Sequence, residues 1–286
     1  MNGLVSPGFI PDTTLRQMRQ LNRQRFHYTE QLSQVKNRIL KVLETANLKF
    51  RSVLSNVNTK SARLIIKALS AGVTDIKLLQ SYCLRKAAKK APLLPEALDG
   101  TLTDNDGKML RLYLSDWDYF DNQIIELEQS MNAILEQGYN PVIGLLQQVP
   151  GIGEQSARTI VAEVGNNLQA FPSADHFTSW AGLAPGNRQS ANKWFAQHTT
   201  KGNKYFRATL IQVAWAAVRT KDGYWQAQFQ YLKNRLPAKK AIVAIAGKMA
   251  KLIYRVITEQ YQYEEKGAAY FINQRGKFHA SKIVAG

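Results

Sequence analysis

The sequence predicts a mainly α-helical protein in which a coiled-coil-like helical hairpin precedes a helical DNA-binding domain. Two long stretches carry apolar residues at alternating spacings of three and four, which is the period of a helix that packs along one side. Stretches with the two-residue alternation of strands are scarce. The third observation is charge, because 38 Lys and Arg residues against 21 Asp and Glu residues give a net charge of +17. This excess favours an anionic partner, with nucleic acid the first candidate and a membrane surface the second.

The first long helix is expected over residues 14–47. Arg25 interrupts its apolar stripe, which consists of Met18, Leu21, Tyr28, Leu32, Val35, Ile39 and Val42. A second helix is expected over residues 110–137, after a turn at 104–107 and before Gly138 and Pro141. Its stripe consists of Tyr113, Trp117, Phe120, Ile124, Leu127, Met131 and Ile134.

Two apolar stripes of similar length predict an antiparallel coiled-coil pair. The alternative is that each stripe faces a compact helical core. Because two exposed apolar stripes are unfavourable in water, we also expect a homodimer or a higher oligomer.

Three parts are expected along the chain. Residues 1–140 form the helical and coiled-coil region, residues 141–262 form a basic helical domain, and residues 263–286 are a tail without a clear pattern. Short helices are expected between the two long ones, in residues 52–100. Residues 186–255 contain 14 Lys or Arg residues and a single acid, Asp222, so the excess positive charge concentrates in the second half of the chain.

A tight turn at residues 149–153, with the sequence VPGIG, separates two apolar helical stretches. Gly151 and Gly153 allow the backbone to turn sharply and to bring its N–H groups close to a phosphate. The following helix would present its positive N-terminal end to the same phosphate. The pattern resembles a helix-hairpin-helix that binds DNA backbone without reading sequence. An ordinary corner between two packed helices is the alternative.

A polar loop over residues 182–207 combines cations with aromatic residues. Its cations are Arg188, Lys193, Lys201, Lys204 and Arg207, and its aromatic residues are Trp194, Phe195, Tyr205 and Phe206. Cations bind phosphates and aromatic faces stack on bases, so the loop is a candidate nucleic-acid site. A solvated basic loop beside a core helix is the alternative. The loop also contains Ser190, a hydroxyl that becomes a nucleophile only when other groups activate it.

The remaining composition excludes several classes of protein. The single cysteine, Cys83, excludes an internal disulfide framework and a cysteine-based zinc site. The acidic residues show no spacing typical of a metal site, so we expect no metal ligands and no cofactor within this chain. The sequence has neither a secretory signal nor an apolar run long enough to cross a membrane, so we expect a cytoplasmic protein.

Several of these segments, taken in order, resemble one group of transposases. The segments are LLQQVPGIGEQSARTIVAEVG, FPSADHFTSWAGLAP, Ser190, KGNKYFR and AIVAIAGKMAKLIYRVI. They resemble the C-terminal domain of the insertion-sequence one-ten family, whose members join a RuvC-like acidic domain to a serine-bearing domain. The resemblance is close over residues 143–260, and the start of the chain is similar to the part of the family that follows the acidic domain.

The resemblance implies a DNA transposase or recombinase chain in which Ser190 is the nucleophile. It implies that Gly151 and Gly153 form the hairpin turn and that Lys201 and Arg207 contact phosphates. DNA is the implied partner, with a guide RNA as a second partner, and the implied location is the bacterial nucleoid. The resemblance further implies that the acidic domain and its Mg²⁺ are missing from this chain, so we expect no cleavage by the chain alone.

Two other readings are compatible with the residues. The first is a non-enzymatic nucleic-acid-binding module that uses the hairpin and the basic loop without cleaving a strand. The second is a helical interaction protein whose positive charge is incidental. Salt-dependent binding to DNA separates the second reading from the others, and a covalent link between DNA and Ser190 separates the enzyme from the binding module.

Overall fold

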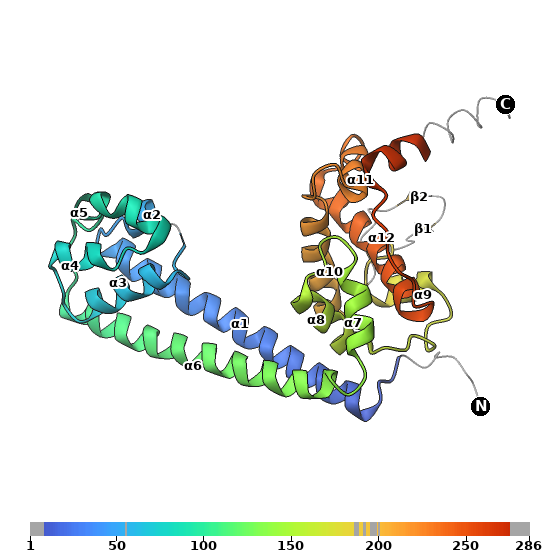
Figure 1. Ribbon diagram of the computed structural model, residues 1–286, viewed down its shortest axis with the longest axis horizontal. Helices are drawn as coiled ribbons and strands as arrows, with labels where there is room; N and C mark the ends of the chain where they lie inside the picture. The colour runs from blue at the N-terminus through green and yellow to red at the C-terminus, as the bar shows by residue number, and fades with distance from the viewer. Residues whose placement is uncertain are drawn as a thin grey trace. The chain divides into compact units, whose positions relative to one another are not determined.

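The computed structural model describes residues 9–54, 56–185 and 201–274, together with Thr199 and the backbone of four residues between 189 and 194. The chain forms two compact units (Figure 1). The first unit combines residues 1–22 with residues 130–286, and the second comprises residues 23–129. The divisions fall inside two long helices, α1 (Thr13–Thr45) and α6 (Asp104–Leu135), rather than at residue 140.

The described residues are mainly helical, as the sequence predicts, and both predicted long helices are present. In the second unit α1 and α6 run antiparallel. The ring of Tyr28 lies 5.6 Å from that of Phe120, between centroids, and Lys36 Nζ lies 4.5 Å from the centroid of Trp117. Arg25, which interrupts the apolar stripe, pairs with Glu128 of α6 at 2.9 Å.

Five short helical segments close the end of the second unit. They are α2 (Phe50–Val53), α3 (Lys60–Ser70), α4 (Ile76–Ser81), the 3₁₀ helix η1 (Arg85–Leu93) and α5 (Leu94–Ala97). The side chains of Thr59 and Asp75 accept hydrogen bonds from the first backbone N–H groups of α3 and α4. The core of this unit includes Ile39, Leu43, Phe50, Ile65, Ile66, Leu79, Leu94 and Leu110.

The start of α6 differs from the turn expected at residues 104–107. Asp106 Oδ2 accepts hydrogen bonds from the backbone N–H and the hydroxyl of Thr103, and Thr103 Oγ1 accepts one from the Asp106 N–H. This reciprocal arrangement starts a helix. Gly107 continues the helix close to α3, where an added Cβ would lie 3.2 Å from the carbonyl oxygen of Ser70.

The first unit contains the ends of α1 and α6 and several further helices. These are α7 (Asn140–Gln147), α8 (Glu154–Val164), α9 (Ala174–Trp180), α10 (Lys204–Ala217), α11 (Tyr224–Lys233) and α12 (Ala238–Thr258). The central helix, α12, packs against α7, α9, α10 and α11 and buries residues along its whole length. A further helical stretch covers residues 267–274 of the expected tail. Within the described part of the chain, no helix combines the length and apolar character needed to cross a membrane.

Candidate nucleic-acid interface

The turn between α7 and α8 is built around Gly151. Its φ of 86° lies in the left-handed region that favours glycine. An added Cβ would lie 2.5 Å from the carbonyl oxygen of Val213 and 2.6 Å from the backbone nitrogen of Ala217, both on α10. The first glycine of the motif therefore allows the turn to pack against the backbone of α10.

Gly153, the second glycine, has a different environment. It is the N-cap residue of α8, with extended backbone and open space around the position of a Cβ. Glu154 occupies the first turn of this helix and pairs with Arg158. The Glu154 side chain is 62% exposed, and the positive charge of Arg158 lies beside it.

Two short strands form a hairpin at the predicted serine. The strands β1 (Gln189–Ser190) and β2 (Lys193–Trp194) pair antiparallel, with Gln189 opposite Trp194 and Ser190 opposite Lys193. An isolated bridge between Pro185 and Thr199 lies nearer the base. The backbone register therefore brings together two of the predicted site residues, Ser190 and Lys193. Their side chains, and all of Arg188, lie outside the described residues.

Arg207, a predicted phosphate ligand, joins the two sides of this loop at its base. Its Nη1 donates to the carbonyl oxygen of Gly182 and, at 2.6 Å, to Thr199 Oγ1. Gly182 precedes the hairpin and Thr199 follows it, so the guanidinium group has a structural role there. The side chain is half-buried and uses this nitrogen within the protein.

The tripeptide Lys201-Gly202-Asn203 packs beside the same base. At Gly202 an added Cβ would lie 2.3 Å from the Gly182 nitrogen and 2.4 Å from the Trp180 carbonyl oxygen. Glycine is therefore required by this close backbone approach. The Asn203 N–H donates to the Trp180 carbonyl oxygen at 3.0 Å. Asn203 Oδ1 accepts from the N–H groups of residues 205 and 206 at 3.1 Å each, and it thereby caps α10.

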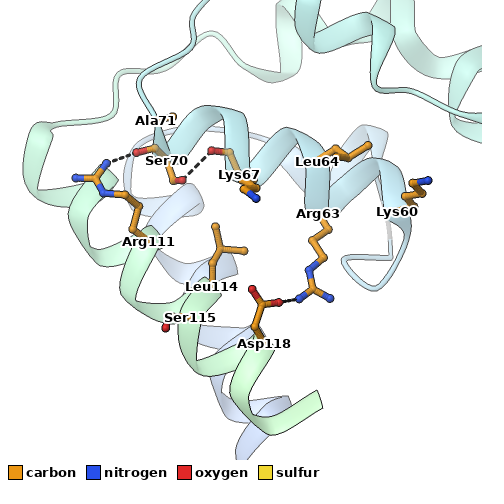
Figure 2. Close-up of a pocket in the computed structure, with 10 residues that line it drawn as sticks. All are labelled: Lys60, Arg63, Leu64, Lys67, Ser70, Ala71, Arg111, Leu114, Ser115 and Asp118. Carbon is orange, nitrogen blue, oxygen red and sulfur yellow. Dashed lines mark hydrogen bonds and ion pairs between the residues drawn. The ribbon is translucent and has the colours of Figure 1, made fainter. Parts of the chain in front are cut away.

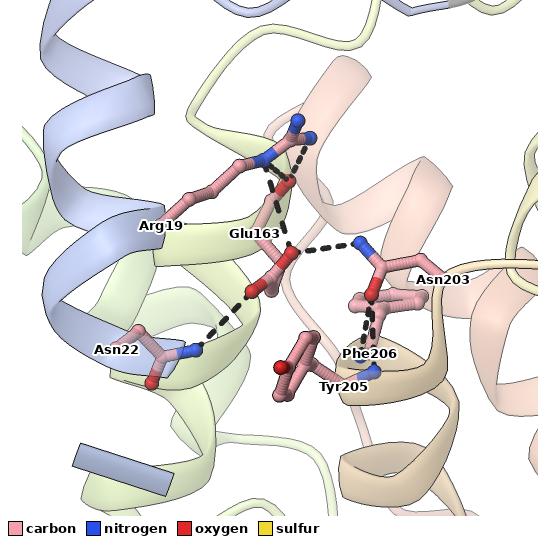
Figure 3. A network of polar contacts seen from close by, with 6 residues as sticks. All are labelled: Arg19, Asn22, Glu163, Asn203, Tyr205 and Phe206. Carbon is pink, nitrogen blue, oxygen red and sulfur yellow. Dashed lines mark hydrogen bonds and ion pairs between the residues drawn. The ribbon is translucent and has the colours of Figure 1, made fainter. Parts of the chain in front are cut away.

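A buried carboxylate holds Asn203 from the other side (Figure 3). Glu163 of α8 is fully buried, and its Oε2 accepts a 2.7 Å hydrogen bond from Asn203 Nδ2. Its Oε1 accepts a 3.4 Å hydrogen bond from Asn22 Nδ2. Arg19 Nε lies 3.8 Å from Oε2 and donates at 2.9 Å to the main-chain carbonyl of Glu163. Residues from α1, α8 and the start of α10 thus form one polar network.

Arg19 also lies against aromatic rings. Its guanidinium carbon is 4.8 Å from the centroid of Phe9 and 5.9 Å from that of Trp180. These rings belong to a cluster that continues to Phe177 and Phe206. The cation is therefore held between the carboxylate of Glu163 and ring faces, which is a favourable setting for a poorly hydrated arginine.

The predicted cations and aromatic residues near α10 divide into surface and core groups. Lys201 and Lys204 are exposed and form no ion pair with any residue in the described ranges. Lys204 Nζ lies 4.9 Å from the ring centroid of Tyr205, which is half-buried. Phe206 is fully buried, so the expectation that it stacks on a base is wrong. Its position on the inner face of α10 explains the difference.

Several acidic side chains of the first unit have protein partners. Glu163 bonds to Asn203, and Asp175 pairs with Lys251 of α12. No group of three His, Cys, Asp or Glu side chains among the described residues is arranged to hold a metal ion. The residues that the structure describes thus do not form a ligand set for the Mg²⁺ that the resemblance implies for the acidic domain.

Sequence reasoning found the glycines and cations of this region but missed Arg19, Asn22, Glu163 and the capping role of Asn203. An Asn directly before a helix is a known N-cap signal and could have been found. Glu163 has no such signal, because its partners lie up to 144 positions away.

Comparisons with known proteins give a consistent result for this unit. Residues 144–230 match the model of the transposase IS116/IS110/IS902 family. The chain is 27% identical over 210 residues to the transposase for insertion sequence element IS1111A of Coxiella burnetii, covering 70% of this chain and 57% of the relative. It is 26% identical over 144 residues to a 43.6 kDa protein of insertion element IS110 from Streptomyces coelicolor, covering 49% and 34%.

A third relative has a different described role. The chain is 30% identical over 153 residues to the pilin gene-inverting protein of Moraxella lacunata, covering 51% of this chain and 44% of the relative. The matches therefore span from about a third to somewhat more than half of the length of these relatives.

Proposed function

We propose that this chain, in which residues 144–230 belong to the IS116/IS110/IS902 transposase family, takes part in DNA transposition or recombination, with Ser190 as the nucleophile. The relatives support the reaction class, since they include a transposase and a pilin gene-inverting protein. The observation that carries the proposal is the hairpin in which Ser190 lies opposite Lys193. The loop that carries this hairpin is held at its two ends by the contacts of Arg207 and Gly202.

The chemistry proposed for Ser190 is attack on a phosphodiester. A base removes the hydroxyl proton, Oγ forms a bond to phosphorus, and the bond from phosphorus to one bridging sugar oxygen breaks. That oxygen leaves and takes up a proton, so one DNA strand is joined to the protein and can later be transferred. A cation such as Lys193 beside the serine would stabilise the negative charge that develops on the phosphoryl oxygens.

DNA binding would come from the surface around the start of α10, where Lys201 and Lys204 are exposed. The turn at Gly151 and Gly153 is the second element, in the manner of a helix-hairpin-helix. Both would contact phosphates and would position DNA without reading its sequence. We further propose that an acidic domain with its Mg²⁺, a guide RNA and self-association of this chain complete the activity in the bacterial nucleoid.

The binding part of the proposal is tested with the double variant Lys201→Ala/Lys204→Ala. We expect weaker binding to all duplex sequences alike, and a plot of log K against log salt concentration that is flatter by about two units. The variant Lys221→Ala/Lys266→Ala removes the same charge from exposed positions of the same unit and is the control. Equal salt slopes in the two variants would contradict this binding surface.

The catalytic part is tested by supplying the acidic domain of a relative in trans with Mg²⁺ and a labelled DNA substrate. Denaturing gels should reveal a covalent adduct between protein and DNA, and Ser190→Ala should abolish it while Gln189→Ala retains it. Strand cleavage that continues at the same rate in Ser190→Ala would refute the assignment. Binding without any adduct in the unaltered chain would favour the non-enzymatic binding module.

A further inference from the structure

The second unit contains a basic groove between α3 and α6 (Figure 2). It has a volume of about 700 Å³. Its charged lining residues are Lys60, Arg63, Lys67, Arg111 and Asp118, so four cations face one carboxylate. This groove lies within residues 23–129, outside the unit that contains Ser190.

Two arginines connect the walls of the groove. Arg63 of α3 pairs with Asp118 of α6 and, at 3.1 Å, with Asp121. Its guanidinium carbon lies 4.8 Å from the ring centroid of the buried Trp117. At the other end, Arg111 Nη1 donates to the carbonyl oxygen of Ser70, the last residue of α3. These contacts join the two helices at both ends, so the groove is a built feature of the unit.

The two lysines of the groove have no such structural role. Lys60 and Lys67 are exposed, and neither forms an ion pair with a residue that the structure describes. They lie seven positions apart on α3, which is two helical turns, so their side chains share one face. The rise between them is about 10 Å, which corresponds to about three base-pair steps measured along the axis of duplex DNA.

The lining also indicates what kind of anion fits. None of the ten lining residues is aromatic, so the groove offers no ring on which an unpaired base or a free nucleotide would stack. The apolar part consists of Leu64, Ala71 and Leu114. Cations without ring faces are typical of contacts to the backbone of a duplex.

We propose that this groove binds the phosphate backbone of duplex DNA, through Lys60 and Lys67, as a second DNA contact of the chain. The choice of DNA as occupant rests on the function proposed above. The contact carries no sequence information, and Arg63 and Arg111 position the walls while the two lysines supply the phosphate ligands.

The test uses the full chain and the double variant Lys60→Ala/Lys67→Ala. Both side chains are exposed, so we expect the fold to be retained, which circular dichroism checks. In a fluorescence titration against a mixed-sequence DNA duplex, the slope of log K against log salt concentration should fall by about 1.8 units, at about 0.9 for each lost phosphate contact. The control variant Lys41→Ala/Lys77→Ala removes two exposed lysines of the same unit outside the groove.

If Lys60→Ala/Lys67→Ala changes the salt slope of DNA binding no more than this control does, the proposal is overturned. The DNA-binding part of the proposed function is tested separately, by Lys201→Ala/Lys204→Ala. A loss of affinity for an RNA duplex of the same sequence, with DNA binding unchanged, also overturns the groove proposal.

A third variant, Asp118→Asn, tests the same site by an expected gain in DNA affinity. It removes the carboxylate from the groove while Asp121 still pairs with Arg63. We expect tighter DNA binding and a steeper salt dependence. Weaker or unchanged binding would contradict a phosphate site at this position.

Discussion

The buried carboxylate of Glu163 provides the sharpest test of the polar network in the first unit. We consider Glu163→Gln, which keeps the shape of the side chain and removes its charge. The 2.7 Å hydrogen bond from Asn203 Nδ2 would then end on a neutral acceptor or face an amide donor. Arg19, which is 13% exposed, would lose the carboxylate that lies 3.8 Å from its Nε.

The magnitude follows from these contacts. A hydrogen bond to a charged group contributes about 1.5–3 kcal/mol, and leaving one partner of a buried ion pair alone costs about 3–5 kcal/mol. The second value is an upper limit here, because Arg19 keeps its 2.9 Å hydrogen bond to the main-chain carbonyl of Glu163. The hydrogen bond from Asn22 Nδ2, at 3.4 Å, contributes little to the free energy of unfolding. We expect Glu163→Gln to lower the free energy of unfolding by about 2–4 kcal/mol.

Guanidinium unfolding followed by tryptophan fluorescence measures this change. Four of the five tryptophans belong to the first unit and only Trp117 to the second, so the signal reports mainly on the affected unit. Glu154→Gln is the matched control on the same helix, because Glu154 is 62% exposed in an i,i+4 pair with Arg158 and should contribute at most about 0.5 kcal/mol. If both variants unfold at the same denaturant concentration, the network does not stabilise the unit and our reasoning is refuted.

Two further predictions concern stability. Gly151→Ala should lower the free energy of unfolding by about 2–5 kcal/mol, because of left-handed strain and the approach of the added Cβ to the backbone of α10. Gly153→Ala replaces an N-cap glycine in open space and should lower it by at most about 1 kcal/mol. Equal effects in denaturant unfolding would contradict this difference. Hydrogen bonds from Thr103 lower the pKa of Asp106 below its ordinary value. The unfolded chain therefore binds this proton first as the pH falls, so the contribution of Asp106 is present above the ordinary carboxyl pKa of about 3.9 and is lost below it. Unfolding curves between about pH 5 and pH 2 should show a smaller acid-dependent loss in Asp106→Asn than in the unaltered chain, and identical losses would disprove the coupling.

The apolar stripes predicted the long helices well because periodicity is a local property. The helix expected over residues 14–47 covers Thr13–Thr45, and that over residues 110–137 corresponds to Asp104–Leu135. The earlier start of α6 has a local signal, because Thr103 and Asp106 have the spacing of a capping box. The close approach of Gly107 to Ser70 could not be predicted, since Ser70 lies on another helix. The coiled-coil geometry and the helix-hairpin-helix stay predictions.

Individual residues of the candidate site could be predicted from the sequence, whereas the contacts between them could not. Charge and spacing predicted Lys201 and Lys204 beside α10, which are exposed, whereas the role of Ser190 stays a prediction from the resemblance. The structural role of Arg207 could not be predicted, since its partners Gly182 and Thr199 are brought together only by the hairpin. The groove on α3 was also missed, because Arg111 approaches that helix only in the folded unit.

The first unit is discontinuous along the chain, and this has a consequence for fragments. A shortened version bounded by the family match at residues 144–230 contains Glu163 and Asn203 but lacks Arg19 and Asn22. Such a fragment would bury a carboxylate without its cation, an arrangement that is strongly destabilising.

The same discontinuity affects the order of events on the ribosome. Residues 23–129 form a contiguous unit that can fold as soon as it emerges, whereas Leu15 and Met18 must wait for partners such as Val164 and Leu135. Arg19 and Glu163 are 144 positions apart, an interval of roughly 7–30 s at ordinary rates of translation. During that time the start of α1 presents apolar side chains to water, so the nascent chain passes through a stage in which a chaperone, or a second nascent copy, can bind them.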